Sequence, residues 1–138
     1  MVIVLGLLGV VAMDHLDPWP QRLREAQLSS ALAAVRTASQ LHHLRCLQSG
    51  ARPCRVTLAD GTEVADAHGY PAASGEGIAR AANLAPMGLQ WRRADRHELP
   101  VLTIHVPTPS GAGCSFTYVQ ASVWGAQPGI DDHRASCR

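Results

Sequence analysis

The feature that most constrains the fold is a helical spacing of residues in the first third of the chain. Steps of three and four separate Leu28, Leu32, Val35, Ser39, His42 and Cys46. Such steps place side chains on one face of an α-helix, and the charged residues between them fall mainly on other faces. Gly50 and Pro53 then end the pattern, because glycine favours helix C-termini and proline interrupts helices. The spacing predicts one long helix that starts at Gln21, stops at Gly50 and buries one face.

An apolar segment precedes this predicted helix. Residues 1–13 carry no charge, and Pro18 and Pro20 follow them. As a helix the segment would be roughly 20 Å long, whereas a membrane-spanning helix needs about 20 residues. It also lacks the basic start and the good cleavage site of a secretory signal. We expect either a buried helix or the tail of a longer apolar helix, which the two prolines should break or kink.

Short strands and turns are predicted for the middle of the chain. Asp60-Gly61 lies between two short runs and is a strong hairpin signal. Ser74 is expected to cap a short helix that Pro86 closes. Residues 89–106 indicate a strand, a polar turn and a second strand, with one face more apolar than the other.

The last third adds one more predicted strand, within residues 114–123. Phe116 and Tyr118 share one face of this strand. The tail, residues 124–138, is rich in turn formers, so we expect it to be irregular and pinned by Cys137. The order of elements predicts an α+β fold in which the long N-terminal helix packs on an antiparallel β-sheet.

Four cysteines, Cys46, Cys54, Cys114 and Cys137, are widely spaced and form no C-x-x-C motif. That arrangement does not indicate a zinc ribbon or a thioredoxin-like redox pair. An even number of dispersed cysteines in a small chain favours structural disulfides outside the cytosol, and four cysteines permit three pairings. We expect the pairs that are local in sequence, Cys46–Cys54 and Cys114–Cys137. The alternative is four reduced, buried thiols.

No pattern in the sequence indicates catalysis. Ser110 does not lie in a G-x-S-x-G motif, and a disulfide-bonded Cys114 near His105 could not act as a nucleophile. Glu63 and Asp66 are expected to be a solvated pair at the edge of a hairpin. Tyr70, after a turn, should cover a sheet edge. We expect no enzymatic activity.

Metal ions and cofactors are also not expected. A zinc site needs three or four converging ligands, and the spacing of the seven histidines does not require that. His42 and His43 are adjacent on the predicted helix, so they point about 100° apart and do not readily bind one ion. Asp131 and Asp132 could bind calcium only with further oxygen ligands, so a solvated acidic turn is the simpler interpretation.

One basic cluster has aromatic character. It consists of Trp91, Arg92, Arg93 and Arg96. Such a group could contact phosphates and stack on a base. The alternative, which Asp95 and Glu98 favour by diluting the charge, is a polar hairpin with the tryptophan on the sheet. The formal net charge of +1 gives no general attraction to nucleic acid, which we do not expect as a partner.

The ordered combination of four segments resembles type IV pilin-like proteins, most closely the mannose-sensitive haemagglutinin (MSHA) pilin type. MVIVLGLLGVVAM is similar to the interior of the pilin N-terminal helix, and LREAQLSSALAAVRTASQLHHL to its amphipathic continuation. VTLADGTEVADAHGYPAAS is similar to the stretch that follows. CSFTYVQAS and a final cysteine resemble the closing strand and disulfide-bounded loop. The similarity covers almost the whole chain.

The resemblance implies a structural subunit of a type IV pilus or a related secretion-system filament, with no enzymatic activity. Residues 1–20 would be the polymerisation and membrane element, and residues 21–138 the globular head. The apolar side chains that would drive assembly are Val2, Ile3, Val4, Leu5, Leu7, Leu8, Val10 and Val11. The implied partners are other pilin subunits. The implied location is the inner membrane before assembly and then the pilus at the cell surface, with a periplasmic or extracellular head and a role in adhesion.

The sequence departs from the family pattern at its start. Pilin precursors carry a short basic leader, a glycine before the cleavage point and an early glutamate, and none of these is present here. We therefore expect an N-terminally truncated version, from a start codon assigned too far downstream or from a degenerate copy. Two other interpretations stay open: an exported, disulfide-bonded binding domain that does not polymerise, and a minor pilin that binds DNA.

Overall fold

The computed structural model describes residues 19–52, 54–107 and 114–132. The predicted polymerisation residues, Val2 to Val11, lie outside the described residues, as do Ser110 and Cys137. Apart from Trp19 and Pro20, all of the described residues belong to the segment 21–138 that the prediction assigns to the head.

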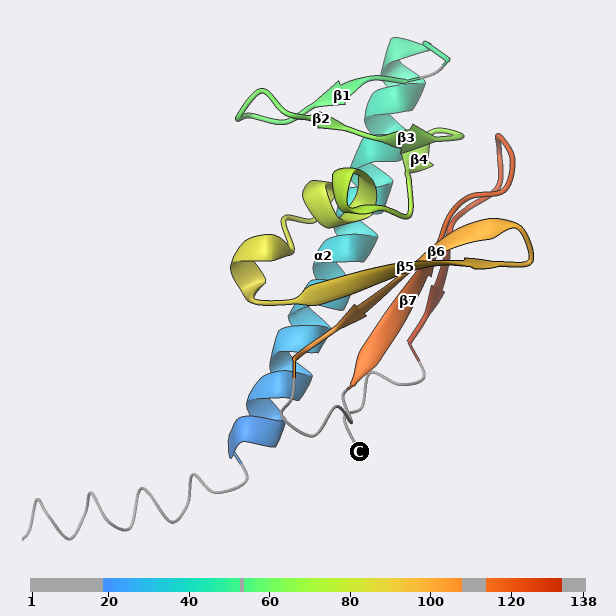
Figure 1. The fold of residues 1–138 in the computed structure, drawn as a ribbon. Helices are drawn as coiled ribbons and strands as arrows, with labels where there is room; N and C mark the ends of the chain where they lie inside the picture. The colour runs from blue at the N-terminus through green and yellow to red at the C-terminus, as the bar shows by residue number, and fades with distance from the viewer. Residues whose placement is uncertain (1–18, 53, 108–113, 133–138) are drawn as a thin grey trace, which may run out of the picture.

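The long helix α2, Trp19–Ser49, runs along the described part of the protein from one end to the other (Figure 1). It begins two residues before the predicted start, and Pro20 lies in its first turn. Backbone N–H groups in the first turn have no acceptor within the helix, so a proline, which lacks the N–H, is tolerated there. Gly50 ends the helix with a φ of 66°, and its N–H donates to the Cys46 carbonyl at 3.1 Å. All six residues of the predicted stripe are buried: Leu28, Leu32, Val35, Ser39, His42 and Cys46.

Two small hairpins lie against the C-terminal half of α2 (Figure 1). The first pairs β1, Val56–Thr57, with β2, Glu63–Val64, and confirms the hairpin predicted at Asp60-Gly61. The second pairs β3, Asp66–Ala67, with β4, Tyr70–Pro71. Each has two-residue strands, so the hairpins depend on the helix for their position.

The connection to the main sheet contains two short helical turns, η1, Gly75–Ala79, and η2, Ala85–Met87. The Ser74 hydroxyl accepts a hydrogen bond from the Gly77 N–H at 3.0 Å, which confirms the predicted cap. Pro86 lies within η2 and not at the end of the first helix, because Asn83, with a φ of 55°, has already turned the chain.

The main sheet has four antiparallel strands in the order β5-β6-β7-β8. They are β5 Gln90–Arg96, β6 Leu99–His105, β7 Ser115–Val119 and β8 Gly129–Asp131. The prediction of an irregular tail is wrong at β8, where Ile130 pairs with Tyr118. A three-residue strand between turn formers leaves almost no alternating pattern, and it forms because β7 offers a free edge of backbone donors and acceptors.

The core lies between α2 and the main sheet. Leu28 and Val35 of the helix share one cluster with Ile104 and Phe116 of the sheet, all of them buried. Ile78 of η1 belongs to the same buried cluster. The structure therefore confirms an α+β fold in which one long helix packs on an antiparallel sheet.

Candidate functional site

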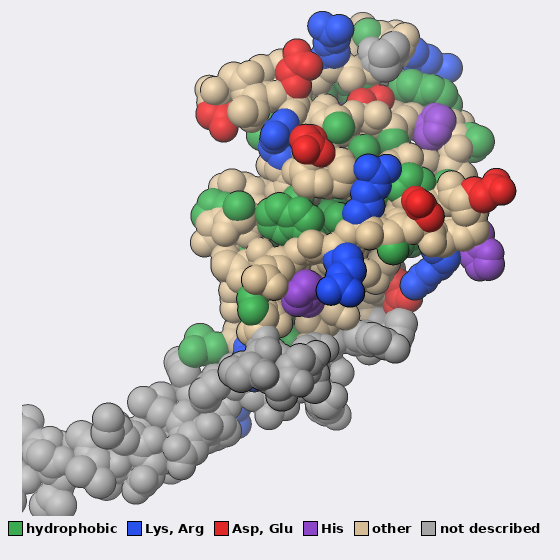
Figure 2. Space-filling view, in the orientation of Figure 1, with side chains coloured by type: hydrophobic (Ala, Val, Ile, Leu, Met, Phe, Trp, Pro, Cys, Tyr) green, Lys and Arg blue, Asp and Glu red, His purple; other side chains and the backbone are tan. Residues whose placement is uncertain are grey.

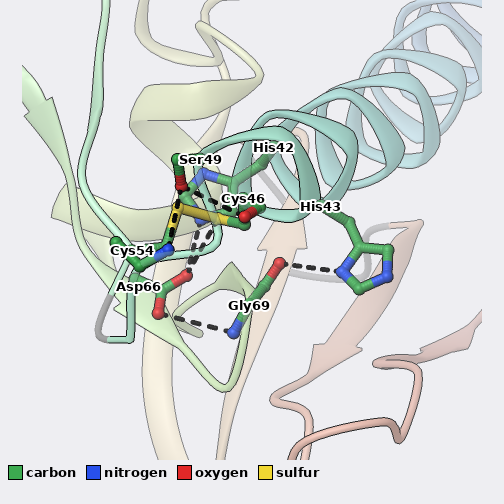
Figure 3. Close-up of a disulfide and its surroundings, with 8 residues drawn as sticks. His42, His43, Cys46, Ser49, Cys54, Asp66 and Gly69 are labelled. Carbon is green, nitrogen blue, oxygen red and sulfur yellow. Dashed lines mark hydrogen bonds and ion pairs between the residues drawn. A yellow bond between two sulfur atoms is a disulfide. The ribbon is translucent and has the colours of Figure 1, made fainter.

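A compact polar cluster lies where α2 meets the two hairpins. His42 and Cys46 are one helical turn apart on the buried face of α2. Cys46 forms a disulfide with Cys54, just beyond the end of the helix, and this confirms the predicted local pairing (Figure 3). Cys46 and Cys54 are 5% and 3% exposed, so the bond is shielded from solvent.

Asp66 points from β3 into this cluster. Its Oδ1 lies 2.8 Å from His42 Nε2, and the two side chains are 5% and 2% exposed (Figure 3). The expectation of a solvated Asp66 is therefore wrong, although Glu63 is exposed as expected. Burying a carboxylate requires a partner, and the partner comes from a helix 24 positions earlier in the sequence. No short-range pattern around Asp66 could indicate that contact.

The neighbouring histidine, His43, has a separate environment. Its ring stacks on Tyr70, with the ring centroids 4.1 Å apart and the planes 4° from parallel. Its Nδ1 lies 3.1 Å from the Gly69 carbonyl, to which the ring N–H donates. Tyr70 is therefore buried against the helix and does not cover a sheet edge, because β4 belongs to the second hairpin and not to the main sheet.

The His42–Asp66 pair and the Cys46–Cys54 pair are close enough for their donor atoms to form one set of metal-ligating atoms. Those atoms belong to His42, Cys46, Cys54 and Asp66, and all lie within 4.8 Å of one another. Cys46 Sγ is 3.7 Å from Asp66 Oδ1. The helical spacing placed His42 and Cys46 on one face, but Asp66 joins them only through the tertiary contact between β3 and α2, so the sequence did not indicate this grouping.

A surface hollow of about 510 Å³ opens beside the second hairpin. It is lined by Arg52, Asp66, Ala67, His68, Gln120 and Trp124. The Arg52 guanidinium lies 4.6 Å from the centroid of the Trp124 ring, and the His68 ring meets that ring edge-on at 6.2 Å. These residues come from three distant segments, so no sequence motif indicates the hollow.

The basic cluster predicted around Trp91 is divided by the strand that carries it. In β5, Trp91 is opposite Ile104, which belongs to the core, whereas Arg92 is opposite Thr103. Residues directly opposite in an antiparallel pair share a face, so Trp91 and Arg93 lie on one face and Arg92 and Arg96 on the other. In Figure 2 basic and acidic side chains are interspersed over the visible described surface. Trp91 packs against the core, as the polar-hairpin interpretation requires.

Exposed leucines follow the outer side of α2. Leu41, Leu44 and Leu47 are 49%, 54% and 64% exposed. Leu44 lies midway between the buried His42 and Cys46 in sequence and thus about 200° around the helix from His42. We call these three residues the outer stripe of α2. In an ordinary surface helix, the positions that face away from the core are occupied by polar residues.

Cys114 also forms a disulfide, so its sulfur is not available as a nucleophilic thiolate. Its predicted partner, Cys137, lies outside the described residues. Within the described ranges, no helix is both long enough and apolar enough to cross a membrane.

Comparison with known proteins adds no relative. No protein-family profile matches the chain. No curated protein and no solved structure matches it either. The function must therefore be inferred from the residues and their arrangement.

Proposed function

We propose that the chain is a non-enzymatic structural subunit of a type IV pilus or a related secretion-system filament. The observation that carries the proposal is the two-sided character of α2. One side is buried on the sheet, and the other exposes Leu41, Leu44 and Leu47 at 49%, 54% and 64%. A helix that faced only water would be polar on its outer side, and contiguous exposed apolar residues are typical of interaction surfaces.

The sequence ahead of α2 supports the same assignment. Residues 1–13 are free of charge, and α2 begins shortly after them. An apolar segment followed by a long amphipathic helix can pack against copies of itself. When such contacts do not close into a ring, they generate a helical fibre. The pilin-like fold remains part of this proposal and goes beyond the α+β arrangement described above.

The proposal includes the partners and the location. Other pilin subunits would cover the outer stripe of α2, and the inner membrane would hold the subunit before assembly. The disulfide Cys46–Cys54 is suited to an oxidising compartment, which supports a head exposed to the periplasm or the cell exterior. Adhesion would then be a role of the displayed head.

A second candidate is an exported binding domain that does not polymerise. The hollow beside Trp124 favours it, because a half-exposed tryptophan, an arginine and a histidine can together recognise a polar ligand. The two candidates differ in what the outer stripe of α2 does. The filament subunit needs that stripe, whereas the binding domain does not.

The test uses the full chain behind a prepilin leader, in cells with a working type IV pilus assembly system. We expect the tagged protein in sheared filaments. Replacing Leu41, Leu44 and Leu47 together by serine should abolish incorporation while leaving the head folded. The matched control replaces Arg45 and Gln48, two exposed polar residues of the same helix, by serine as well. This variant should assemble normally. A chain that stays monomeric, or a triple variant that assembles as well as its control, contradicts the proposal.

A further inference from the structure

We propose that the reduced head binds one zinc-like divalent metal ion at the place now closed by the Cys46–Cys54 disulfide. The ligands would be His42 Nε2, Cys46 Sγ, Cys54 Sγ and one oxygen of Asp66. The inference does not depend on the proposed function, since it rests on this cluster alone. The cluster then has two exclusive states, an oxidised one with a disulfide and a reduced one with a metal ion.

The spacing of the donor atoms fits a tetrahedral site. Zinc bonds of about 2.0–2.3 Å place neighbouring ligand atoms roughly 3.3–3.8 Å apart. All four donor atoms lie within 4.8 Å of one another, and Cys46 Sγ is already 3.7 Å from Asp66 Oδ1. Reduction frees the two sulfurs to separate. The His42–Asp66 contact of 2.8 Å has to open by roughly half an ångström, which side-chain rotation can provide.

The types of donor and their surroundings also suit zinc. Two thiolates, an imidazole and a carboxylate are all zinc ligands, and a closed set of four is typical of structural sites. The four side chains are at least nine-tenths shielded from solvent, so water would not compete readily for the ion. The ligands arise from α2, the segment after it and β3, so one ion would link the same elements as the disulfide.

The ligands are held in place by neighbouring groups. His42 and Cys46 are separated by one turn of α2, which fixes their relative positions. The Gly69 N–H donates to Asp66 Oδ2 at 3.4 Å, which leaves Oδ1 directed at the other ligands (Figure 3). Such outer contacts orient ligands in known metal sites. Arg52 lines the same hollow as Asp66 and adds positive charge near a set of three anionic ligands.

Transfer of two electrons interconverts the two states. A dithiol reductant gives two electrons and two protons to the disulfide, which yields two thiols and an oxidised dithiol. Binding of Zn²⁺ then releases the two thiol protons to solvent as both sulfurs become thiolates. In the reverse direction an oxidised dithiol takes two electrons from the two thiolates and two protons from solvent, so the protein disulfide forms again, the dithiol is regenerated and Zn²⁺ is released. A newly made chain, before its disulfide forms, would have the reduced state available.

The test refolds the full-length chain in detergent, with or without a phosphine reductant, and adds Zn²⁺. After desalting, elemental mass spectrometry should find one zinc per reduced chain and none on the oxidised chain. Co²⁺ in place of Zn²⁺ should give a thiolate-to-metal charge-transfer band and intense tetrahedral d–d bands. No uptake by the reduced chain, or retention of the ion after oxidation, would overturn the proposal.

Matched variants distinguish this cluster from general thiol binding. His42→Gln and Asp66→Asn should each weaken zinc binding at least tenfold, since lost outer contacts alone weaken metal affinity 10–100-fold in other sites, by about 1.4 kcal/mol per factor of ten. His43→Gln and Cys114→Ser should bind as tightly as the parent. Equal affinity of the His42 and His43 variants would refute the assignment. If a variant does not fold, the Co²⁺ spectrum of the parent protein tests the proposal instead. Octahedral d–d bands, or the absence of a thiolate-to-metal charge-transfer band, would contradict it.

Discussion

His42 Nε2 lies 2.8 Å from Asp66 Oδ1, and this contact fastens the second hairpin to the long helix inside the protein. Removing one member of a buried pair leaves the other polar group buried without its partner, which lowers the free energy of unfolding by about 3–5 kcal/mol. We expect Asp66→Ala to lower the free energy of unfolding by about 3 kcal/mol, measured by urea denaturation of the oxidised protein.

The exposed Glu63 supplies the control for that measurement. Glu63→Ala should change the free energy of unfolding by less than about 0.5 kcal/mol, because an exposed side chain without such a partner contributes little. Equal effects of the Glu63 and Asp66 substitutions would show that the contact between His42 and Asp66 does not stabilise the protein.

Local patterns predicted the parts of the fold that depend on local geometry. The stripe from Leu28 to Cys46 indicated which side of α2 is buried, because helical spacing alone decides which residues share a face. Asp60-Gly61 indicated the first hairpin, since those residues adopt the backbone angles of tight turns. The same reasoning placed Cys46 and Cys54 within reach of each other.

Long-range contacts could not be predicted in the same way. Whether Asp66 is solvated or buried depends on where β3 lies relative to α2, which no spacing near Asp66 records. β8, Gly129–Asp131, forms because β7 presents a free edge, and its three residues are too few to show alternation. The grouping of the four metal-ligating atoms requires both of these kinds of information, a helix face and a tertiary contact.

The turn between β5 and β6 stores removable strain. His97 and Glu98 have φ values of 51° and 67°, in a region that side-chain-bearing residues seldom adopt. Asn-Gly suits a two-residue turn of this kind. We expect His97→Asn/Glu98→Gly to raise the free energy of unfolding by about 1–2 kcal/mol, measured by thermal denaturation. The reverse-order pair, His97→Gly/Glu98→Asn, is the control and should gain no more than the first pair. A destabilised Asn-Gly variant would contradict the turn geometry.

Position 77, in the connection before the main sheet, requires a glycine because the backbone of Ala72 passes very close to it. A Cβ at this position would lie 2.1 Å from the Ala72 carbonyl oxygen, which is backbone and cannot turn aside. We expect Gly77→Ala to destabilise the protein by about 1–3 kcal/mol, the usual cost of forcing atoms into filled space. Gly129→Ala is the control, because its nearest contact would be an ordinary 3.4 Å from Val119. Similar denaturation midpoints for the two variants would show that the loop adapts.

Tyr118 should make the stability of the protein sensitive to alkaline pH. Its hydroxyl donates to the Pro71 carbonyl at 2.7 Å, and burial raises its pKa above the ordinary value of 10.0. The folded state therefore holds the phenolic proton more tightly than the unfolded state. The resulting stability is complete below about pH 10 and is lost as the pH rises from there toward the raised pKa.

The variant Tyr118→Phe separates this effect from other alkaline changes. It should cost about 1 kcal/mol at pH 7, because the hydrogen bond to Pro71 is lost. Above pH 10 its free energy of unfolding should fall less steeply than that of the parent, by up to about 1.4 kcal/mol per pH unit for the single proton. Urea denaturation of both proteins between pH 8 and pH 11.5 measures the two slopes. Parallel slopes would mean that Tyr118 ionises as readily in the folded protein as in the unfolded chain, and would contradict the prediction drawn from its burial.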